Sequence, residues 1–148
     1  MSDINIRQFQ RTDSQQVIDL WFTCGLVRSW NNPQRDIERK MAEHPELFFV
    51  AELEGLLIGS CMAGYEGHRG WIYYLAVHPQ FQRRGVAAQL MQRAETGLAV
   101  IGCPKVELMI RSTNLPVVEF YETIGYVQEP VVVMSKRLIE DVPYERSA

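Results

Sequence analysis

The sequence has few cysteines and no long uncharged run. Its three cysteines, Cys24, Cys61 and Cys103, lie far apart and lack the Cys-x-x-Cys or Cys/His spacing of a zinc site, so we expect free thiols and no metal. The longest uncharged runs, such as residues 70–82, are shorter than the ~18–20 residues that cross a membrane. The N-terminus also lacks the apolar segment of a signal peptide. These absences predict a cytoplasmic protein with no membrane partner.

A large excess of either sign of charge is also absent. The net charge is −3, and the acidic excess falls in residues 1–74, whereas residues 75–148 are balanced. The basic pair Arg83-Arg84 suits a small phosphorylated ligand better than duplex nucleic acid, so we expect no nucleic-acid partner. Proline and glycine are not concentrated in any segment. A chain of about 150 residues with this composition is long enough to bury one hydrophobic core.

The order of apolar patterns predicts an α+β fold. Strands are expected at residues 4–9, 47–51, 56–59, 71–77 and 106–110, with closing strands at 126–127 and 131–134, and helices at about 13–24, 33–44, 85–101 and 116–124. Thr12 or Asp13 is positioned to cap the first helix and Asn32 the second. We therefore expect one domain over residues 1–148, with a central mixed, twisted sheet and helices on both faces. The tail is expected to be poorly defined from about residue 139.

The passage from the strand at 71–77 to the following helix is the most informative stretch. It contains no acidic residue until Glu95, so the first-turn amides and the positive end of the helix dipole are free to bind a phosphate. Gly85 permits close approach, and Arg83 and Arg84 add charge. From spacing alone, an ordinary turn with solvated arginines is equally compatible. The sequence contains neither GxxxxGK[ST] nor GxGxxG, which argues against an NTPase or a dinucleotide dehydrogenase.

Two motifs in this half of the chain resemble the GCN5-related N-acetyltransferases. Gln82-Arg83-Arg84-Gly85-Val86-Ala87 matches the hallmark [QR]xxGx[GA] and follows Leu75-Ala76-Val77-His78-Pro79. Asn114 is followed by Phe120-Tyr121-Glu122 and Gly125-Tyr126, which matches a second block of the family. The resemblance covers residues 71–127 and extends to the small bacterial YpeA-type branch. It implies acetyl-CoA as the co-substrate.

By this resemblance, the cofactor arm would pair with the backbone of one strand and the pyrophosphate would lie on the following loop. The implied cofactor-binding residues are Leu75, Ala76, Val77, Gln82, Arg83, Arg84, Gly85, Val86, Ala87 and Asn114. Tyr121 matches the general acid that protonates the departing thiolate. From the residues alone, Asn114 can equally be a helix-start residue, and Tyr121 can be a core tyrosine beside Phe120.

The general base is where this chain departs from its relatives. Met109 and Trp71 occupy the positions at which relatives often carry a glutamate, and neither can accept a proton. Glu66 and Glu107 are the carboxylates near these positions, and we name both as candidate bases. Each can instead be a solvated surface carboxylate, and an ordered water can take the proton.

The resemblance therefore predicts an acetyl-CoA-dependent N-acetyltransferase acting on a primary amine of a peptide, a protein or a small molecule. The acidic N-terminal half favours a cationic acceptor, bound near the first two helices and residues 28–32. Trp21 can belong to the buried stripe of a helix or to the wall of a substrate site. Trp30 can be an exposed aromatic platform or a residue that anchors an interface. A homodimer is compatible with such a fold. The alternatives are a non-catalytic acyl-CoA-binding regulatory module and a phosphate binder that carries the motif by chance.

Overall fold

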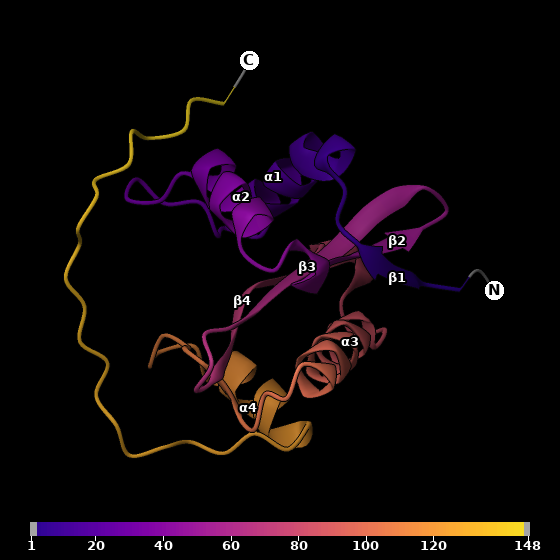
Figure 1. Ribbon diagram of the computed structural model, residues 1–148. Coiled ribbons are helices and arrows are strands. Elements are labelled where there is room, and N and C mark those ends of the chain that lie inside the picture. Colours follow the sequence, from indigo (N-terminus) through magenta and orange to yellow (C-terminus); the bar gives the residue numbers. More distant parts are fainter. Residues whose placement is uncertain (1–2, 147–148) are drawn as a thin grey trace.

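A five-stranded sheet crosses the centre of the molecule, with two helices against each face (Figure 1). The computed structural model describes residues 3–146. The strands are β1 (Asn5–Gln8), β2 (Phe48–Leu53), β3 (Leu56–Tyr65), β4 (Gly70–Val77) and β5 (Val106–Leu108). The helices are α1 (Ser14–Thr23), α2 (Pro33–Ala42), α3 (Val86–Val100) and α4 (Leu115–Thr123), with 3-10 turns η1 (Arg11–Asp13), η2 (Pro45–Leu47) and η3 (Pro79–Phe81). Helices α1 and α2 cover one face, and α3 and α4 cover the other.

The strand order is the sequence order, β1-β2-β3-β4-β5, and the sheet is mixed. The first four strands are antiparallel neighbours, whereas β4 and β5 are parallel and joined through α3. This confirms the predicted α+β class and the element order as far as α4. Only three residues of β4, Gly70–Ile72, pair with β5. The pairing ends at Ile72 and Leu108, where β5 itself ends, and this leaves the rest of that edge of β4 without a strand neighbour.

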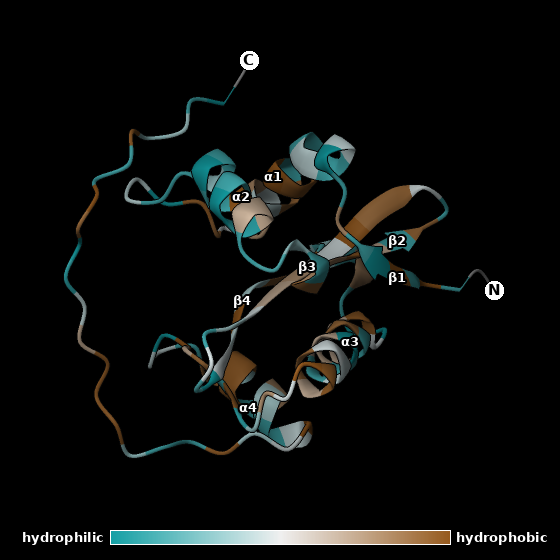
Figure 2. Ribbon diagram, viewed as in Figure 1, coloured by the Kyte–Doolittle hydropathy of each residue, from teal (hydrophilic) through white to brown (hydrophobic). Residues whose placement is uncertain are grey.

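The sheet separates two hydrophobic cores. On one side the buried stripe of α3 packs against the sheet, and its members are Val86, Leu90, Met91, Ala94 and Leu98. On the other side α1 contributes Val17, Ile18 and Trp21, which are almost fully buried. Figure 2 shows α2 as a mostly hydrophilic helix, and it contributes the buried Ile37 to this second core. Burying one such side chain stabilises the fold by about 1.5–3 kcal/mol, so these stripes fix the helices to the two faces.

A bulge interrupts β4 opposite β3. The register shifts between Ser60 and Met62, and Tyr74 has a φ of 52°, which is rare for a residue with a large side chain. The Tyr74 ring is turned toward α1 and stacks on Trp21 with the ring centroids 3.8 Å apart. The Trp21 indole N–H donates to Ser60 Oγ at 2.9 Å, and that hydroxyl donates to the Tyr74 carbonyl at 2.8 Å. These contacts hold the bulge in place and make Trp21 a core residue.

The two predicted helix caps have different outcomes. Asn32 accepts a hydrogen bond from the Arg35 amide at 3.2 Å, which confirms it as the cap of α2. Asp13 occupies the N-cap position of α1 but makes no capping bond into that helix. Its carboxylate instead accepts from the Gln10 amide at 2.8 Å and from both terminal nitrogens of Arg7. A buried carboxylate without a cationic partner costs more free energy than a helix without a side-chain cap, so Asp13 pairs with Arg7.

The predicted closing strands at 126–127 and 131–134 are wrong. After α4 the chain is extended to Arg146 but pairs with no strand among the described residues. Figure 1 shows this segment passing outside the sheet from α4 to the side of α1 and α2. A valine-rich run has the propensity for a strand, but a strand also needs a partner edge.

None of the helices within residues 3–146 has the length and apolar content needed to cross a bilayer.

Candidate active site

The open edge of β4 begins where β5 leaves it. The His78 amide donates to the Ile58 carbonyl of β3 at 2.8 Å, and Ala76 is registered with Ser60 of that strand. Because the backbone groups of successive strand residues point to alternate edges, those of Leu75 and Val77 point away from β3. No strand of the described chain pairs with this edge. An extended ligand can therefore bind there as an additional strand would.

The edge leads directly to the start of α3. His78 Nδ1 accepts from the Gln80 amide at 3.1 Å, and the Arg84 guanidinium lies 5.2 Å from the centre of the Phe81 ring. Gly85, the N-cap residue of α3, has a φ of 77°. A side chain added at Gly85 would meet no atom within 4 Å, so the space beside its backbone is open.

The amides at the start of α3 are suited to an anion. The first turn of the helix contains no acidic residue, and Gly85 offers no side chain to cap it. The N–H groups of Val86 and Ala87 have no carbonyl one turn before them in the helix. Together with the positive end of the helix dipole, these N–H groups favour a phosphate group. The residues present thus fit the diphosphate of a CoA-like molecule.

Tyr121 lies on the inner face of α4. Its ring is buried and packs edge to face against Phe120 at 5.1 Å and Tyr126 at 5.5 Å. Its hydroxyl has no hydrogen-bond partner among the described residues, yet every fully enclosed side-chain N or O atom in that part of the chain has one. The hydroxyl is therefore not fully enclosed by the described residues. Burial raises the pKa of Tyr121 above its ordinary value, so the phenol carries its proton throughout the physiological range.

Asn114 stands at the N-cap position of α4, but its side chain does not cap the helix. The side chain is exposed and makes no hydrogen bond with another described residue. The sequence left open a helix-start role and a ligand role. The position agrees with the first, whereas the free amide group is available for the second.

The two carboxylates named as candidate bases are both engaged. Glu66 accepts from the amides of His68 at 2.7 Å and Arg69 at 2.5 Å, and from the Trp71 indole N–H at 3.2 Å. These bonds, that of Arg69 foremost, lower the pKa of Glu66 below its ordinary value. Glu107 forms one ion pair, with Arg69 Nε at 3.3 Å. A carboxylate that already accepts three hydrogen bonds is a weak base, so Glu66 fits a role in the β3–β4 turn better than proton abstraction.

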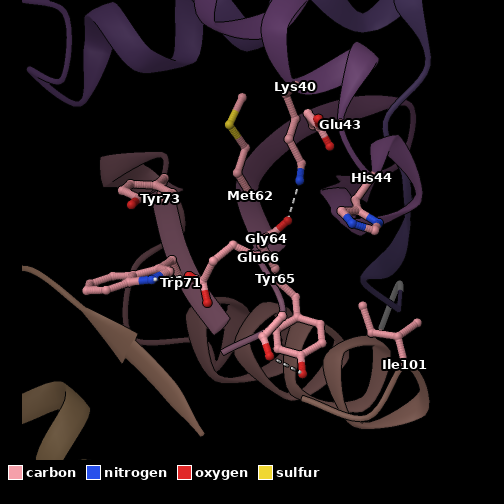
Figure 3. A pocket seen from close by; sticks show the side chains of 12 residues that line it. Lys40, Glu43, His44, Met62, Gly64, Tyr65, Glu66, Trp71, Tyr73 and Ile101 are labelled. Carbon is pink, nitrogen blue, oxygen red and sulfur yellow. Dashed lines mark hydrogen bonds between the residues drawn. The ribbon is translucent and has the colours of Figure 1, made fainter. Parts of the chain in front are cut away.

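A cleft of about 1000 Å³ lies on the α2 side of the sheet (Figure 3). Trp71 and Tyr73, two residues apart on β4, form one wall, and Lys40 and Glu43 at the end of α2 form the other. Tyr73 follows the last residue of β4 that pairs with β5, so the cleft reaches the point where the strands part. Lys40 Nζ donates to the Ala63 carbonyl, and burial lowers the pKa of Lys40.

The sequence did not single out Tyr73, Lys40 or Glu43 as site residues. The alternation of side chains along β4 places Trp71 and Tyr73 on one face, and this signal could have identified that wall. Residues 28–32, where acceptor contacts were expected, do not line the cleft. Trp30 is half exposed, with the Arg111 guanidinium 5.8 Å from its ring.

One of the three cysteines touches the open edge of β4, since Cys24 Sγ donates to the Val77 carbonyl at 3.4 Å. All three are free thiols, as predicted. Burial raises the pKa of Cys61 to about 12, so it stays protonated and is not a nucleophile at neutral pH. Within residues 3–146, no group of three or more histidine, cysteine, aspartate or glutamate side chains is arranged to hold a metal ion.

The pairing of β4 with β5 ends early, and the free edge of β4 leads to the uncapped N-terminus of α3. This arrangement is typical of an acyl-CoA-dependent transferase fold. The model of the acetyltransferase (GNAT) family matches residues 11–126, and the chain belongs to this family. It is an acetyltransferase, and its family uses acyl-CoA. The resemblance found in the two motifs is thereby confirmed.

Relatives and solved structures agree with this assignment. The chain is 49% identical over 142 residues to an acetyltransferase of Sodalis glossinidius, which covers 95% of this chain and all of the relative. It is 48% identical over 141 residues to an uncharacterized N-acetyltransferase of Yersinia pestis, with the same coverage. The fold is similar to that of the aminoglycoside N-acetyltransferase AAC(6')-Iy in complex with CoA, with a TM-score of 0.76, 18% identity, and coverage of 94% of this chain and 97% of that one.

Proposed function

We propose that this acetyltransferase transfers an acetyl group from acetyl-CoA directly to the nitrogen of a primary amine. The observation that carries the proposal is the open edge of β4, which leads without interruption to the uncapped N-terminus of α3. That path runs through η3 and residues 82–85, and it offers an edge for the amide groups of a pantetheine arm and an anion site at its end. Acetyl-CoA has this order of chemical groups.

The residues that would hold acetyl-CoA form a continuous path. The backbone of Leu75, Ala76 and Val77 provides the strand edge, in which Leu75 and Val77 point outward. The loop residues Gln82, Arg83, Arg84, Gly85, Val86 and Ala87 provide the diphosphate site and two positive charges. The free carboxamide of Asn114 would bind the arm from the opposite side, at the start of α4.

We assign the proton-donating role to Tyr121. As the new C–N bond forms and the C–S bond breaks, the Tyr121 hydroxyl gives its proton to the departing sulfur. A thiolate has an ordinary pKa of about 8.5, below that of the phenol, so the transfer depends on the hydroxyl being held close. Its buried ring and its hydroxyl, which has no partner among the described residues and is not fully enclosed, suit that role.

The acceptor must lose a proton before or during its attack. Of the two carboxylates, Glu107 is the better candidate because a single ion pair leaves its second oxygen without a bond to a charged group. Glu66 is the weaker candidate because three donors hold it. An ordered water that passes the proton to solvent is the second route.

We place the acceptor in the cleft between α2 and β4. Its aromatic wall of Trp71 and Tyr73 and the carboxylate of Glu43 suit an amine that is cationic in solution. The Lys40 ammonium opposes a cation, but it is turned toward the Ala63 carbonyl. A panel of amines of equal size, charged or neutral outside the reacting nitrogen, tests this placement. Glu43→Gln should raise the KM of the charged acceptors alone.

The decisive experiment is an acetyl-CoA titration followed by thermal stability. At 100 times its Kd, the ligand should add about 2.7 kcal/mol to the folded state, or about 5–10 °C in Tm. Gly85→Glu should abolish this rise because it puts bulk and negative charge at the diphosphate site. Gly55→Glu is the matched control, since Gly55 has a similar φ of 80° and equally open space in the β2–β3 turn. A rise that survives Gly85→Glu would refute the site.

A further inference from the structure

Lysine is rare in this chain. Of its 15 lysines and arginines, only Lys40, Lys105 and Lys136 are lysines. Lys105 forms an ion pair with Glu129 at 2.9 Å, and Lys136 is exposed. Of the three, only Lys40 is half-buried and lines the cleft in which we place the acceptor. One primary amine of the acceptor cleft therefore belongs to the protein itself.

The Lys40 side chain extends from the last turn of α2 to the surface of the sheet (Figure 3). Its Nζ donates to the Ala63 carbonyl of β3. A Cβ added to Gly64 would lie 3.8 Å from this Nζ, so the missing side chain leaves room for the amine. Gly64 is registered with Trp71 of β4, and the side-chain positions of such a pair lie on the same face of a sheet. The amine therefore lies on the face that carries the aromatic wall of the cleft.

The neighbouring basic residue of α2 is held elsewhere. Arg39 donates to the Asp141 carboxylate at 2.6 and 2.8 Å, lies 3.5 Å from Asp36, and does not line the cleft. Lys40 is the only lysine or arginine among the described residues that line it. Its single hydrogen bond within the described chain goes to the Ala63 carbonyl. A neutral amine can keep that bond and still present its lone pair.

Burial prepares Lys40 to act as a nucleophile. It lowers the pKa of Lys40 below the ordinary lysine value. The carboxylates of Glu46 in η2 and Glu43 in α2 oppose this shift but do not outweigh it. Cys61 of β3 is protonated at neutral pH and adds no charge. At a given pH, more of Lys40 than of a solvated lysine is therefore the neutral amine, which is the form that attacks a thioester.

The order of groups in acetyl-CoA places its acetyl group toward this amine. In the proposed function, the diphosphate lies at the start of α3 and the pantetheine arm runs back along β4 from Val77 to Leu75. The thioester follows the arm, so it lies toward Tyr73, which lines the cleft. Tyr73 is two residues beyond Trp71, or about 7 Å along the strand. The flexible four-carbon stem of Lys40 allows its amine to swing toward this end of the cleft.

We propose that Lys40 is a site of self-acetylation, at which the protein transfers an acetyl group from its own bound acetyl-CoA to Nζ. This inference rests on the proposed function. The lone pair of Nζ attacks the thioester carbonyl, so that a C–N bond forms and the C–S bond breaks. The nitrogen releases one proton to solvent, and the sulfur takes one proton from Tyr121, which regains a proton from solvent. The products are an acetylated lysine and CoA.

Acetylation changes the charge of the cleft. It converts the Lys40 ammonium into a neutral amide, and the carboxylates of Glu43 and Glu66 remain in the lining. The unmodified ammonium opposes a cationic acceptor, as described above. Self-acetylation therefore prepares the cleft for such an acceptor.

The test needs no external acceptor. The full chain is incubated with acetyl-CoA that carries a deuterated acetyl group, and mass spectrometry follows the label at each lysine. We expect Lys40 to be labelled roughly tenfold faster, or more, than Lys105 and Lys136, because its amine is held beside the thioester. These two lysines report the uncatalysed reaction. The rate at Lys40 should not depend on protein concentration, since the amine and the bound thioester belong to one molecule.

Variants separate this reaction from chemical acetylation. Lys40→Arg keeps the positive charge, and it should abolish the fast labelling while retaining the rise in Tm with acetyl-CoA. Lys136→Arg is the matched control and should leave the fast labelling unchanged. Tyr121→Phe should slow labelling at Lys40 but not at Lys136.

Two results would overturn self-acetylation. One is a rise in Tm with acetyl-CoA but no preferential label at Lys40, which would leave the proposed function standing and make Lys40 a permanent cation of the cleft. The other is labelling of Lys40 that persists in Gly85→Glu, because the label would then come from unbound acetyl-CoA. The absence of any rise in Tm in the wild type would instead refute the proposed function itself.

Discussion

The hydroxyl of Tyr74, at the bulge of β4, donates a hydrogen bond of 2.6 Å to the carboxylate of Asp36 on α2. The Asn31 side chain donates to the same hydroxyl at 2.8 Å. Burial, followed by the bond to Asp36, raises the pKa of Tyr74 above its ordinary value, so the phenol remains a donor. Since Tyr74 directly precedes Leu75, these bonds join α2 to the edge proposed for acetyl-CoA.

Replacing this hydroxyl tests how firmly the bulge is held. Tyr74→Phe keeps the stacking on Trp21 but leaves Asp36 without its donor. We expect a loss of about 1–3 kcal/mol in the free energy of unfolding, because the lost bond is to a charged group. Urea unfolding at neutral pH measures it. Tyr65→Phe is the control: its exposed hydroxyl donates at 3.2 Å to the Gly67 carbonyl, and it should cost less than Tyr74→Phe. Equal losses would contradict the special role of Tyr74.

Tyr121→Phe tests the proposed proton donor. The substitution removes one oxygen that is not fully enclosed and keeps the ring packing, so the fold and the affinity for acetyl-CoA should be retained. We expect kcat to fall roughly 10²-fold. Because burial holds the pKa of Tyr121 above the ordinary phenol value of about 10, wild-type activity should not fall up to pH 9 through loss of this proton.

Tyr126→Phe is the matched control for that experiment. The Tyr126 ring packs against Tyr121, but its hydroxyl is bound to Glu95 rather than open to solvent. It should lower stability and leave kcat within a small factor of the wild-type value. If both variants lose the same activity, the effect of Tyr121→Phe comes from packing, and the proton-donor role is refuted.

The pair of Arg7 and Asp13 predicts an acid-sensitive element. The hydrogen bonds from Arg7 are the largest cause of a lowered pKa for Asp13, which is almost fully buried. A folded-state pKa below the unfolded value means that the stabilisation is complete above the unfolded pKa of about 3.9 and is lost as the pH falls through the folded pKa. Asp13→Asn should cost about 1.5–3 kcal/mol at pH 7.

Unfolding of wild type and variant should be compared from pH 7 to below pH 3. The difference between them should shrink only below about pH 4. Asp19→Asn is the control, since Asp19 is exposed and holds Gln15 and Arg146 at the surface. A difference between wild type and Asp13→Asn that stays constant down to pH 2 would contradict the assigned pairing.

Much of this fold could be predicted because its signals are local. The buried stripe of α3 follows the helical period, and Asn32-Pro33 marks the start of α2. The prediction of the closing strands was wrong because strand formation depends on an edge elsewhere in the fold. The β-propensity of Val131–Met134 does not specify which strand they pair with, or in which register. The Tyr74 bulge was not predicted, since it depends on stacking with Trp21, 53 positions earlier in the chain.

The candidate site was predictable where backbone geometry defines it. Gly85 and the absence of acidic residues around it predict an anion site from the sequence, and the open space beside Gly85 is compatible with that prediction. The engagement of Glu66 by three donors could not, because two of them are backbone amides oriented by the turn. The acceptor cleft also depends on the packing of α2 against β4, which brings Lys40 and Glu43 opposite Tyr73.

The contact between Arg39 and Asp141 joins positions 102 residues apart. During synthesis on a ribosome, Arg39 is therefore made 102 residues before Asp141. Until Asp141 follows, Arg39 has Asp36 as its only carboxylate partner among the described residues of α2 within one turn. A nascent chain, or one cut before Asp141, has its sheet but lacks this ion pair, and proteolysis just before Asp141 would return the folded molecule to that earlier state.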